Sequence, residues 1–126
     1  MLSLTVSEIT ELHDSIIIKT GGSPGLRDMG LLESAVLGCH QSFDGVDLYP
    51  TVIDKSARMA YSICKNHPFV DGNKRSAVIA MLVLLRINGV ELTYSQHELV
   101  SLGVGISNDL ITYEEIASWI NAHVSC

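Results

Sequence analysis

Apolar residues recur at helical spacing near the start of the chain. Ile9, Leu12 and Ile16 follow one another at intervals of three and four residues, which places them on one face of a helix. Thr5 and Glu8 stand three residues apart just before this run and have the pattern of a capping box. Together they predict a helix that begins after Thr5.

Two further helices are predicted before residue 67. The glycines of GGSPG at 21–25 break the first helix, and Asp28 can cap a second one that extends to about Cys39. A third helix is predicted from about Thr51 to Asn66. Its apolar face consists of Ile53, Ala57, Ala60, Tyr61 and Cys64.

The most apolar run of the chain, AVIAMLVLL at 77–85, lies in a fourth predicted helix. This helix begins near Asn73 and runs to Ile87, and the Asn88-Gly89 pair is a typical C-terminal stop. Because the run leaves almost no polar face, we expect this helix to be the central, buried one.

The remaining pattern completes the fold class. Capping boxes that begin at Ser95 and Thr112 predict two more helices. Segment 41–50, QSFDGVDLYP, differs, because its apolar residues flank Asp44-Gly45, a common two-residue hairpin turn. We therefore predict an all-α fold, a compact bundle of about six helices with one short β-hairpin, in a single domain over residues 1–126.

Composition agrees with one globular domain and argues against direct binding to nucleic acids. The 126 residues are 47% hydrophobic and 17% charged, and the net charge is −6. Nucleic-acid-binding domains normally carry a basic excess or stripe. The charge is locally positive in the segment from Lys65 to Arg75, which holds three cations and one anion. A small positive pocket on an acidic protein favours an anionic small molecule.

The cysteines and the N-terminal segment indicate a cytoplasmic protein. Cys39 and Cys64 fall on predicted apolar faces, the chain has three cysteines, and no CxxC occurs, so we interpret them as reduced core residues. The N-terminal residues lack the basic start and long apolar run of a signal peptide. The apolar run at 77–85 is too short to span a bilayer, and we expect no association with a membrane.

One nonapeptide, HPFVDGNKR at 67–75, combines a base, an anion and two cations in the turn before the fourth helix. The first amides of a helix have no intrahelical acceptor, and the helix dipole attracts anions to them. Gly72 lets the backbone approach a ligand closely and permits a positive φ. Lys74 and Arg75 follow directly, so the segment predicts a phosphate site.

Two side chains beside this phosphate site suggest a reaction. Asp71 is suited to hold Mg²⁺ next to bound phosphates, and His67 is suited to take a proton from an attacking hydroxyl. Taken alone, each residue has a plainer interpretation: Asp71 as a turn residue and His67 as a helix-end residue. Their combination favours transfer of a phosphate-containing group from a nucleotide. We assign Phe69 to the core, where it would hold the loop.

A second histidine–aspartate combination, His13-Asp14, has the pattern of a metal-dependent phosphohydrolase pair. Such sites need further histidine and aspartate ligands, and the other histidines show no matching spacing. We therefore interpret His13 as a helix or interface residue.

The nonapeptide resembles the signature loop of the Fic/Doc family, HxFx(D/E)xNxR, and GGSPGLRD at 21–28 is similar to the death-on-curing branch of that family. The resemblance implies a Fic/Doc-like fold in which His67 activates a Ser/Thr hydroxyl of a target protein. It implies that Asp71 holds Mg²⁺ and that the hairpin at 41–50 docks the target. The residues implied to bind the phosphates of ATP are Gly72, Asn73, Lys74 and Arg75.

The branches of this family differ in the group that they transfer. Members that transfer AMP carry HPFxxGNGRxxR, whereas death-on-curing toxins have lysine at the position of Lys74 and phosphorylate the translation factor EF-Tu, which blocks translation. Lys74, and Val78 in place of the final arginine, favour transfer of the γ-phosphate. Pro68 and Gly72 are closer to the AMP-transferring form. Protein adenylylation therefore stays open, as does a catalytically silent module that only binds its antitoxin.

The resemblance also implies a partner protein. Many Fic-type enzymes are restrained by an internal helix with (S/T)xxxE(G/N), which this sequence does not contain. The death-on-curing branch is restrained by a separate antitoxin whose C-terminal segment folds on the toxin. We therefore expect an antitoxin, and an exposed apolar groove would be its physical sign.

Overall fold

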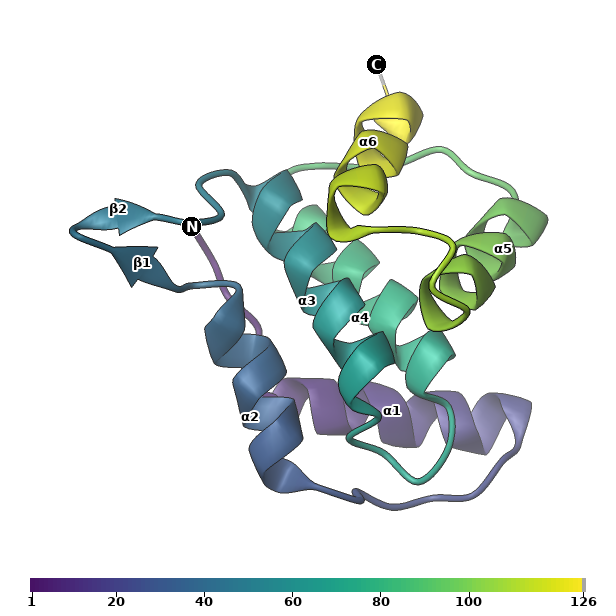
Figure 1. Cartoon of the computed structure of the whole chain (residues 1–126). Coiled ribbons are helices and arrows are strands. Elements are labelled where there is room, and N and C mark those ends of the chain that lie inside the picture. The colour runs from purple at the N-terminus through teal and green to yellow at the C-terminus, as the bar shows by residue number, and fades with distance from the viewer. Residues whose placement is uncertain (126) are drawn as a thin grey trace.

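The computed structural model describes residues 1–125, and its fold is the predicted all-α bundle with one small hairpin (Figure 1). The helices α3 and α4 lie side by side in the middle, and α1 crosses below them. Cys126 lies outside the described residues. The elements are α1 (Val6–Thr20), α2 (Met29–Gly38), β1 (Ser42–Phe43), β2 (Val46–Asp47), α3 (Val52–Asn66), α4 (Asn73–Ile87), α5 (Gln96–Ser107) and α6 (Tyr113–His123).

Five of these helices begin with a side-chain cap, and the sequence predicts four of these caps. The capping boxes at Thr5, Ser95 and Thr112 and the Asp28 cap of α2 are confirmed. A further box was missed at the start of α3, where the Thr51 hydroxyl accepts from the Asp54 amide and the Asp54 carboxylate accepts from the Thr51 amide. The prediction missed it because Asp replaces the usual Glu or Gln.

The core forms around two helices rather than one. α4 contacts α1, α3 and α5, and α3 contacts α2, α4, α5 and α6, so α3 shares the central place that the sequence predicts for α4 alone. α4 is also less completely enclosed than its composition predicts, because Ile79, Leu82 and Val83 are only half-buried. Phe69 is 1% exposed, which confirms its assignment to the core. Cys39 and Cys64 are likewise buried, with free thiols.

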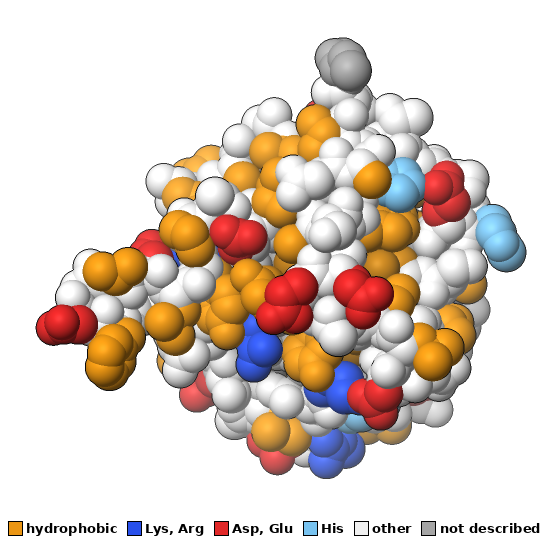
Figure 2. Space-filling view, turned by 45° about the horizontal axis from the view of Figure 1, so that its top comes forward, with side chains coloured by type: hydrophobic (Ala, Val, Ile, Leu, Met, Phe, Trp, Pro, Cys, Tyr) orange, Lys and Arg blue, Asp and Glu red, His pale blue; other side chains and the backbone are white. Residues whose placement is uncertain are grey.

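The hairpin has the predicted position and turn. Ser42 pairs with Asp47 and Phe43 with Val46, and Asp44 and Gly45 at the turn have φ values of 54° and 79°, as a two-residue hairpin loop requires. It projects from the body with hydrophobic side chains on its surface (Figure 2). Lys55 of α3, 6% exposed, anchors its base by donating to the Asp47 carboxylate and to a backbone carbonyl.

A clasp formed by His123 and Glu98 joins α6 to α5. The His123 Nε2 lies 2.6 Å from a Glu98 carboxylate oxygen, and its Nδ1 lies 2.7 Å from the Trp119 carbonyl oxygen. Both neighbours are acceptors, so both ring nitrogens donate when the ring is protonated. The bond to Glu98, followed by that to Trp119, raises the pKa of His123, and the bond to His123 is the main cause that lowers the pKa of Glu98 to about 2.

Among residues 1–125, no helix has both the length and the apolar character needed to cross a membrane.

The clasp predicts a pH-dependent contribution to stability. Because its pKa is raised, His123 stabilises the fold fully below its ordinary value of 6.5, and this contribution is lost as the pH rises through the raised value. Glu98 contributes above 4.5 and loses its contribution as the pH falls through about 2. His123→Gln should therefore lower the unfolding temperature most between about pH 4.5 and 6.5, and less at pH 9, in thermal denaturation.

The matched control is the same substitution in a Glu98→Gln background. There the effect of His123→Gln should depend much less on pH, because the carboxylate that is the largest cause of the raised histidine pKa is gone and only the bond to the Trp119 carbonyl still raises it. An equal pH dependence in both backgrounds would contradict the clasp.

Candidate functional site

The nonapeptide forms the loop that joins the two central helices. His67 ends α3 in the left-handed region with φ 49°, a conformation that histidine tolerates better than most residues. Gly72 precedes α4 with φ 75°, where a side chain would be strained. Between them the chain turns back sharply, so the end of α3 and the beginning of α4 face the same region of solvent.

The start of α4 differs from that of every other helix in residues 1–125. Gly72 has no side chain to cap it, and no side-chain hydrogen bond replaces the cap. The first-turn amides, from Asn73 to Arg75, have no acceptor within the helix. Beside them lies a pocket of about 240 Å³. The structure brings all six predicted site residues to this pocket, which is lined by His67, Val70, Asp71, Gly72, Asn73, Lys74 and Arg75. Their roles in binding and catalysis stay predictions.

Asp71 is held in place at both carboxylate oxygens. One oxygen accepts from the Ser23 amide at 3.1 Å and the other from the Gly72 amide at 2.8 Å. These two bonds, in that order, with Arg75 nearby, hold the pKa of the Asp71 carboxyl below its ordinary value. The carboxylate is therefore an exposed anion in a fixed orientation. A single carboxylate of this kind beside a phosphate site suits Mg²⁺, which takes its other ligands from phosphates and water.

The side chain of Asn73 is used within the loop. Its amide oxygen accepts from the Phe69 N–H at 2.9 Å, and its amide nitrogen donates to the Phe69 carbonyl at 3.0 Å. Asn73 is 8% exposed, so this reciprocal pair closes the loop inside the protein. In this arrangement both polar atoms of the Asn73 side chain already have a partner in the loop, and its backbone N–H remains to be offered to a ligand.

The two cations of the loop have different surroundings. Arg75 is half-buried and donates to the Thr20 hydroxyl and, at 3.3 Å, to the Gly21 carbonyl, so it is tied to the end of α1. Lys74 is exposed. It lies between the phosphate pocket and a second, apolar groove of about 270 Å³ between α4 and α5, because Lys74 and Arg75 line both.

Sequence reasoning missed the segment that holds this loop from outside, residues 21–28, which we call the strap. Its amides at Arg27 and Asp28 donate to the Pro68 carbonyl at 2.7 and 2.9 Å, and Val70 donates back to Gly25 at 3.0 Å. Leu26 and Phe69 form an isolated β-bridge. The strap residues belong to GGSPGLRD, which the sequence indicates only as a turn followed by a helix cap.

Arg27 was missed as a structural partner of His67. Its guanidinium donates to the His67 carbonyl at 2.7 Å and to the Asn66 carbonyl at 2.8 Å. These are the last carbonyls of α3, and a cation is favourable at the negative end of a helix. Arg27 thereby fixes the backbone from which the imidazole of His67 extends.

Comparison with known proteins identifies the family of this chain. A family model described as the Fic/DOC family matches residues 3–85. The chain belongs to the Fic/Doc family. It is 32% identical over 117 residues to a protein of Escherichia phage P1 named "Protein kinase doc", with 93% of this chain and 91% of that protein aligned.

A second relative is "Toxin Doc" of Mycolicibacterium smegmatis. It is 47% identical over 75 residues, which are 60% of this chain. The aligned part spans only 58% of that relative's own length.

The close contact between the strap and Asp71 gives a prediction for this Fic/Doc loop. A Cβ added at Gly22 would lie 2.6 Å from an Asp71 carboxylate oxygen, whereas one added at Gly21 would meet nothing within 4 Å. Gly22→Ala should displace the Asp71 carboxylate and weaken binding of Mg²⁺–ATP, measured by titration calorimetry, by about tenfold or more, the effect of one lost hydrogen bond to a charged group.

Gly21→Ala is the matched control, because both glycines have positive φ, 82° at Gly21 and 113° at Gly22, and both substitutions strain the backbone. Equal losses in the two variants would show that backbone strain, and not contact with Asp71, is responsible.

Proposed function

We propose that this protein is a death-on-curing toxin that transfers the γ-phosphate of ATP to a Ser or Thr hydroxyl of a target protein. The target class is a translation factor similar to EF-Tu, and its modification would block translation. The observation that carries the proposal is the uncapped start of α4, with Asp71 and His67 at the same pocket. The two relatives named as a toxin and as a protein kinase support it.

The phosphates would bind where the structure leaves backbone donors available. The first-turn amides of α4 and the positive end of its dipole would face them, with Lys74 and Arg75 adding charge. Asp71 would hold Mg²⁺, which supplies charge neutralisation between the phosphates. The Asp71 carboxylate is already oriented by two hydrogen bonds, and the first-turn amides are fixed by the backbone of α4, so little rearrangement would be needed on binding.

His67 would act as the base. It is exposed at the pocket, and its backbone is fixed by Arg27. Its left-handed conformation ends α3 and turns the chain into the loop that lines the pocket. A hydroxyl placed between His67 and the terminal phosphate would lose its proton to the imidazole as the oxygen attacks phosphorus. The bond from that phosphorus to the β-phosphate oxygen then breaks, and ADP leaves.

The apolar groove between α4 and α5 would receive the rest of the nucleotide. It joins the phosphate pocket at Lys74 and Arg75, and its wall includes Val78, Val100 and Val104. A purine is flat and largely apolar on its faces, so such a wall suits it. Lys74 stands at the junction, where its side chain would influence which phosphate lies nearest His67.

The hairpin would dock the target. Phe43, Val46 and Leu48 are 76%, 67% and 50% exposed, an unusual concentration of apolar surface on so small a sheet. Within residues 1–125 its two strands pair only with each other, so both outer edges would be open to an added strand of the target.

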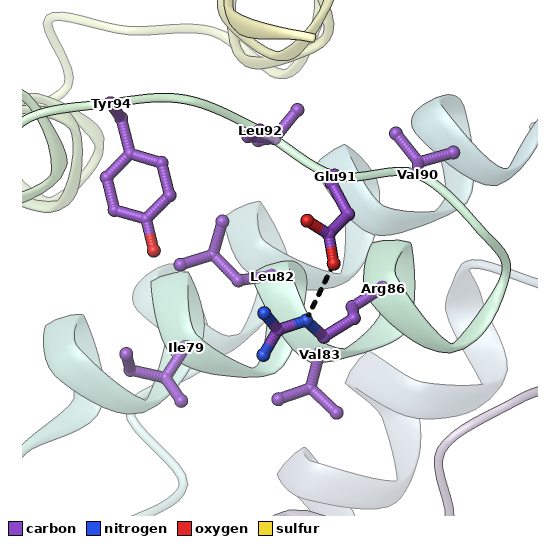
Figure 3. A pocket seen from close by; sticks show the side chains of 8 residues that line it. All are labelled: Ile79, Leu82, Val83, Arg86, Val90, Glu91, Leu92 and Tyr94. Carbon is purple, nitrogen blue, oxygen red and sulfur yellow. Dashed lines mark hydrogen bonds and ion pairs between the residues drawn. The ribbon is translucent and has the colours of Figure 1, made fainter. Parts of the chain in front are cut away.

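The antitoxin would cover the half-buried strip of α4. Ile79 and Val83 belong to this strip, and each of them lines hollows that border the strip. Figure 3 shows the hollow between α4 and residues 90–94, in which Leu82 lies between Tyr94 on one side and the ion pair of Arg86 and Glu91, at 3.2 Å, on the other. An amphipathic segment with apolar residues at helical spacing would fill such a strip.

Transfer of label tests the reaction. The protein is incubated with Mg²⁺, cell extract and ATP labelled at the α- or the γ-phosphate. We expect protein labelled from the γ position only. Label from the α position would instead assign AMP transfer, the alternative that Pro68 and Gly72 favour. The absence of transfer from either position would leave the antitoxin-binding module.

His67→Ala should reduce the transfer rate by at least about a hundredfold, because general-base catalysis typically contributes that much. His97→Ala is the matched control, an exposed histidine outside the phosphate pocket. A His67→Ala variant that transfers label as fast as the wild type would refute the role of this imidazole.

The antitoxin surface has its own test. Val83→Glu should weaken neutralisation by the antitoxin, measured as growth on co-expression, while label transfer stays within about twofold. Leu110→Glu, at a residue 73% exposed and remote from the strip, is the control and should be neutralised normally. Normal neutralisation of Val83→Glu would place the antitoxin elsewhere.

A further inference from the structure

His13 is a buried polar side chain that the proposed reaction does not use. It lies on α1 and is 1% exposed, which is unusual for a histidine unless its nitrogens have partners. Its ring stacks on Phe69 of the loop, with centroids 3.9 Å apart and planes inclined by 3°. Its Nε2 lies 2.7 Å from the carbonyl oxygen of Asp71. The interpretation of His13 as a helix or interface residue missed this contact.

The direction of this hydrogen bond follows from its partner. A carbonyl oxygen only accepts, so the His13 Nε2 carries the proton and donates. The carbonyl belongs to the peptide unit that joins Asp71 to Gly72. The N–H at the other end of the same unit donates to the Asp71 carboxylate at 2.8 Å. One peptide plane is therefore held at its oxygen by α1 and at its nitrogen by the candidate metal ligand.

The orientation of this peptide matters for the phosphate site. It directly precedes α4, and Gly72, with φ 75°, has the conformational freedom to let it rotate. Rotation would turn the Gly72 N–H away from Asp71 and remove one of the two bonds that orient the carboxylate. In the observed orientation, the carboxylate and the amides of α4 face one pocket.

We propose that His13 is a positioning residue that sets the plane of the Asp71–Gly72 peptide, and through it the Asp71 carboxylate at the phosphate site. This inference rests on the proposed function for its effect on nucleotide binding. Its structural part stands on the hydrogen bond and the stack alone. The competing explanation is that His13 only fills the core against Phe69.

Two substitutions at His13 test the hydrogen-bond donor and the flat ring separately. His13→Gln keeps an N–H donor at a similar reach and loses the flat ring, whereas His13→Phe keeps a flat ring against Phe69 and loses the donor. Titration calorimetry with Mg²⁺–ATP should show that His13→Phe binds about tenfold more weakly than His13→Gln, the amount that one lost hydrogen bond is worth. If His13 only fills the core, His13→Phe should bind as well as His13→Gln or better, and this result would overturn the proposal.

Amide exchange gives a readout that needs no nucleotide. Measured by NMR, the Gly72 N–H should exchange faster in His13→Phe than in the wild type and remain protected in His13→Gln. If the wild-type protein binds no Mg²⁺–ATP, the proposed function fails, while this measurement still decides the role of His13. Equal protection in both variants would overturn that role.

A measurement on the wild-type protein guards against variants that do not fold. Nitrogen NMR of the His13 ring should show the tautomer with the proton on Nε2. A proton on Nδ1 alone would leave Nε2 without a hydrogen to donate to Asp71 and would overturn the proposal.

Discussion

The unpaired amides at the start of α4 are the feature on which the site depends. Five helices of the described chain begin with a side-chain cap, which typically stabilises a helix by about 1 kcal/mol. α4 begins instead at Gly72, without one. Its body is buried against α1, α3 and α5, so packing keeps the helix formed without the cap. The donors left over at its first turn are then available to an anion.

Such a site works only if the loop before it is rigid, and three parts of the protein contribute to that. Asn73 closes the loop from within, Arg27 holds the end of α3, and His13 supports the peptide before Gly72. The strap adds backbone hydrogen bonds along the outside. A loop fixed in this way would not have to be ordered when a ligand binds, which reduces the entropic cost of binding.

The local sequence pattern was sufficient to predict the helices and the hairpin, but it was not sufficient to predict the contacts between them. Four of the five helix caps, the Asp44-Gly45 turn and the ends of α4 each depend on residues a few positions apart, and each was predicted correctly. His13 and Asp71 are 58 residues apart, and Arg27 and His67 are 40 apart. Nothing in their neighbourhoods along the chain indicates the pairing.

The contacts divide the loop into residues that are bonded within the protein and residues that would face the proposed substrate. Asp71, Asn73 and Arg75 all have hydrogen bonds within the protein, whereas His67 and Lys74 extend as exposed side chains on either side of the pocket. In the proposed reaction, a fixed frame would determine where the phosphates bind, but it would not by itself determine which phosphate lies opposite His67. That selection would require a side chain that is long, charged and free to follow the nucleotide. Lys74 fits this description, at the junction of the phosphate pocket and the apolar groove.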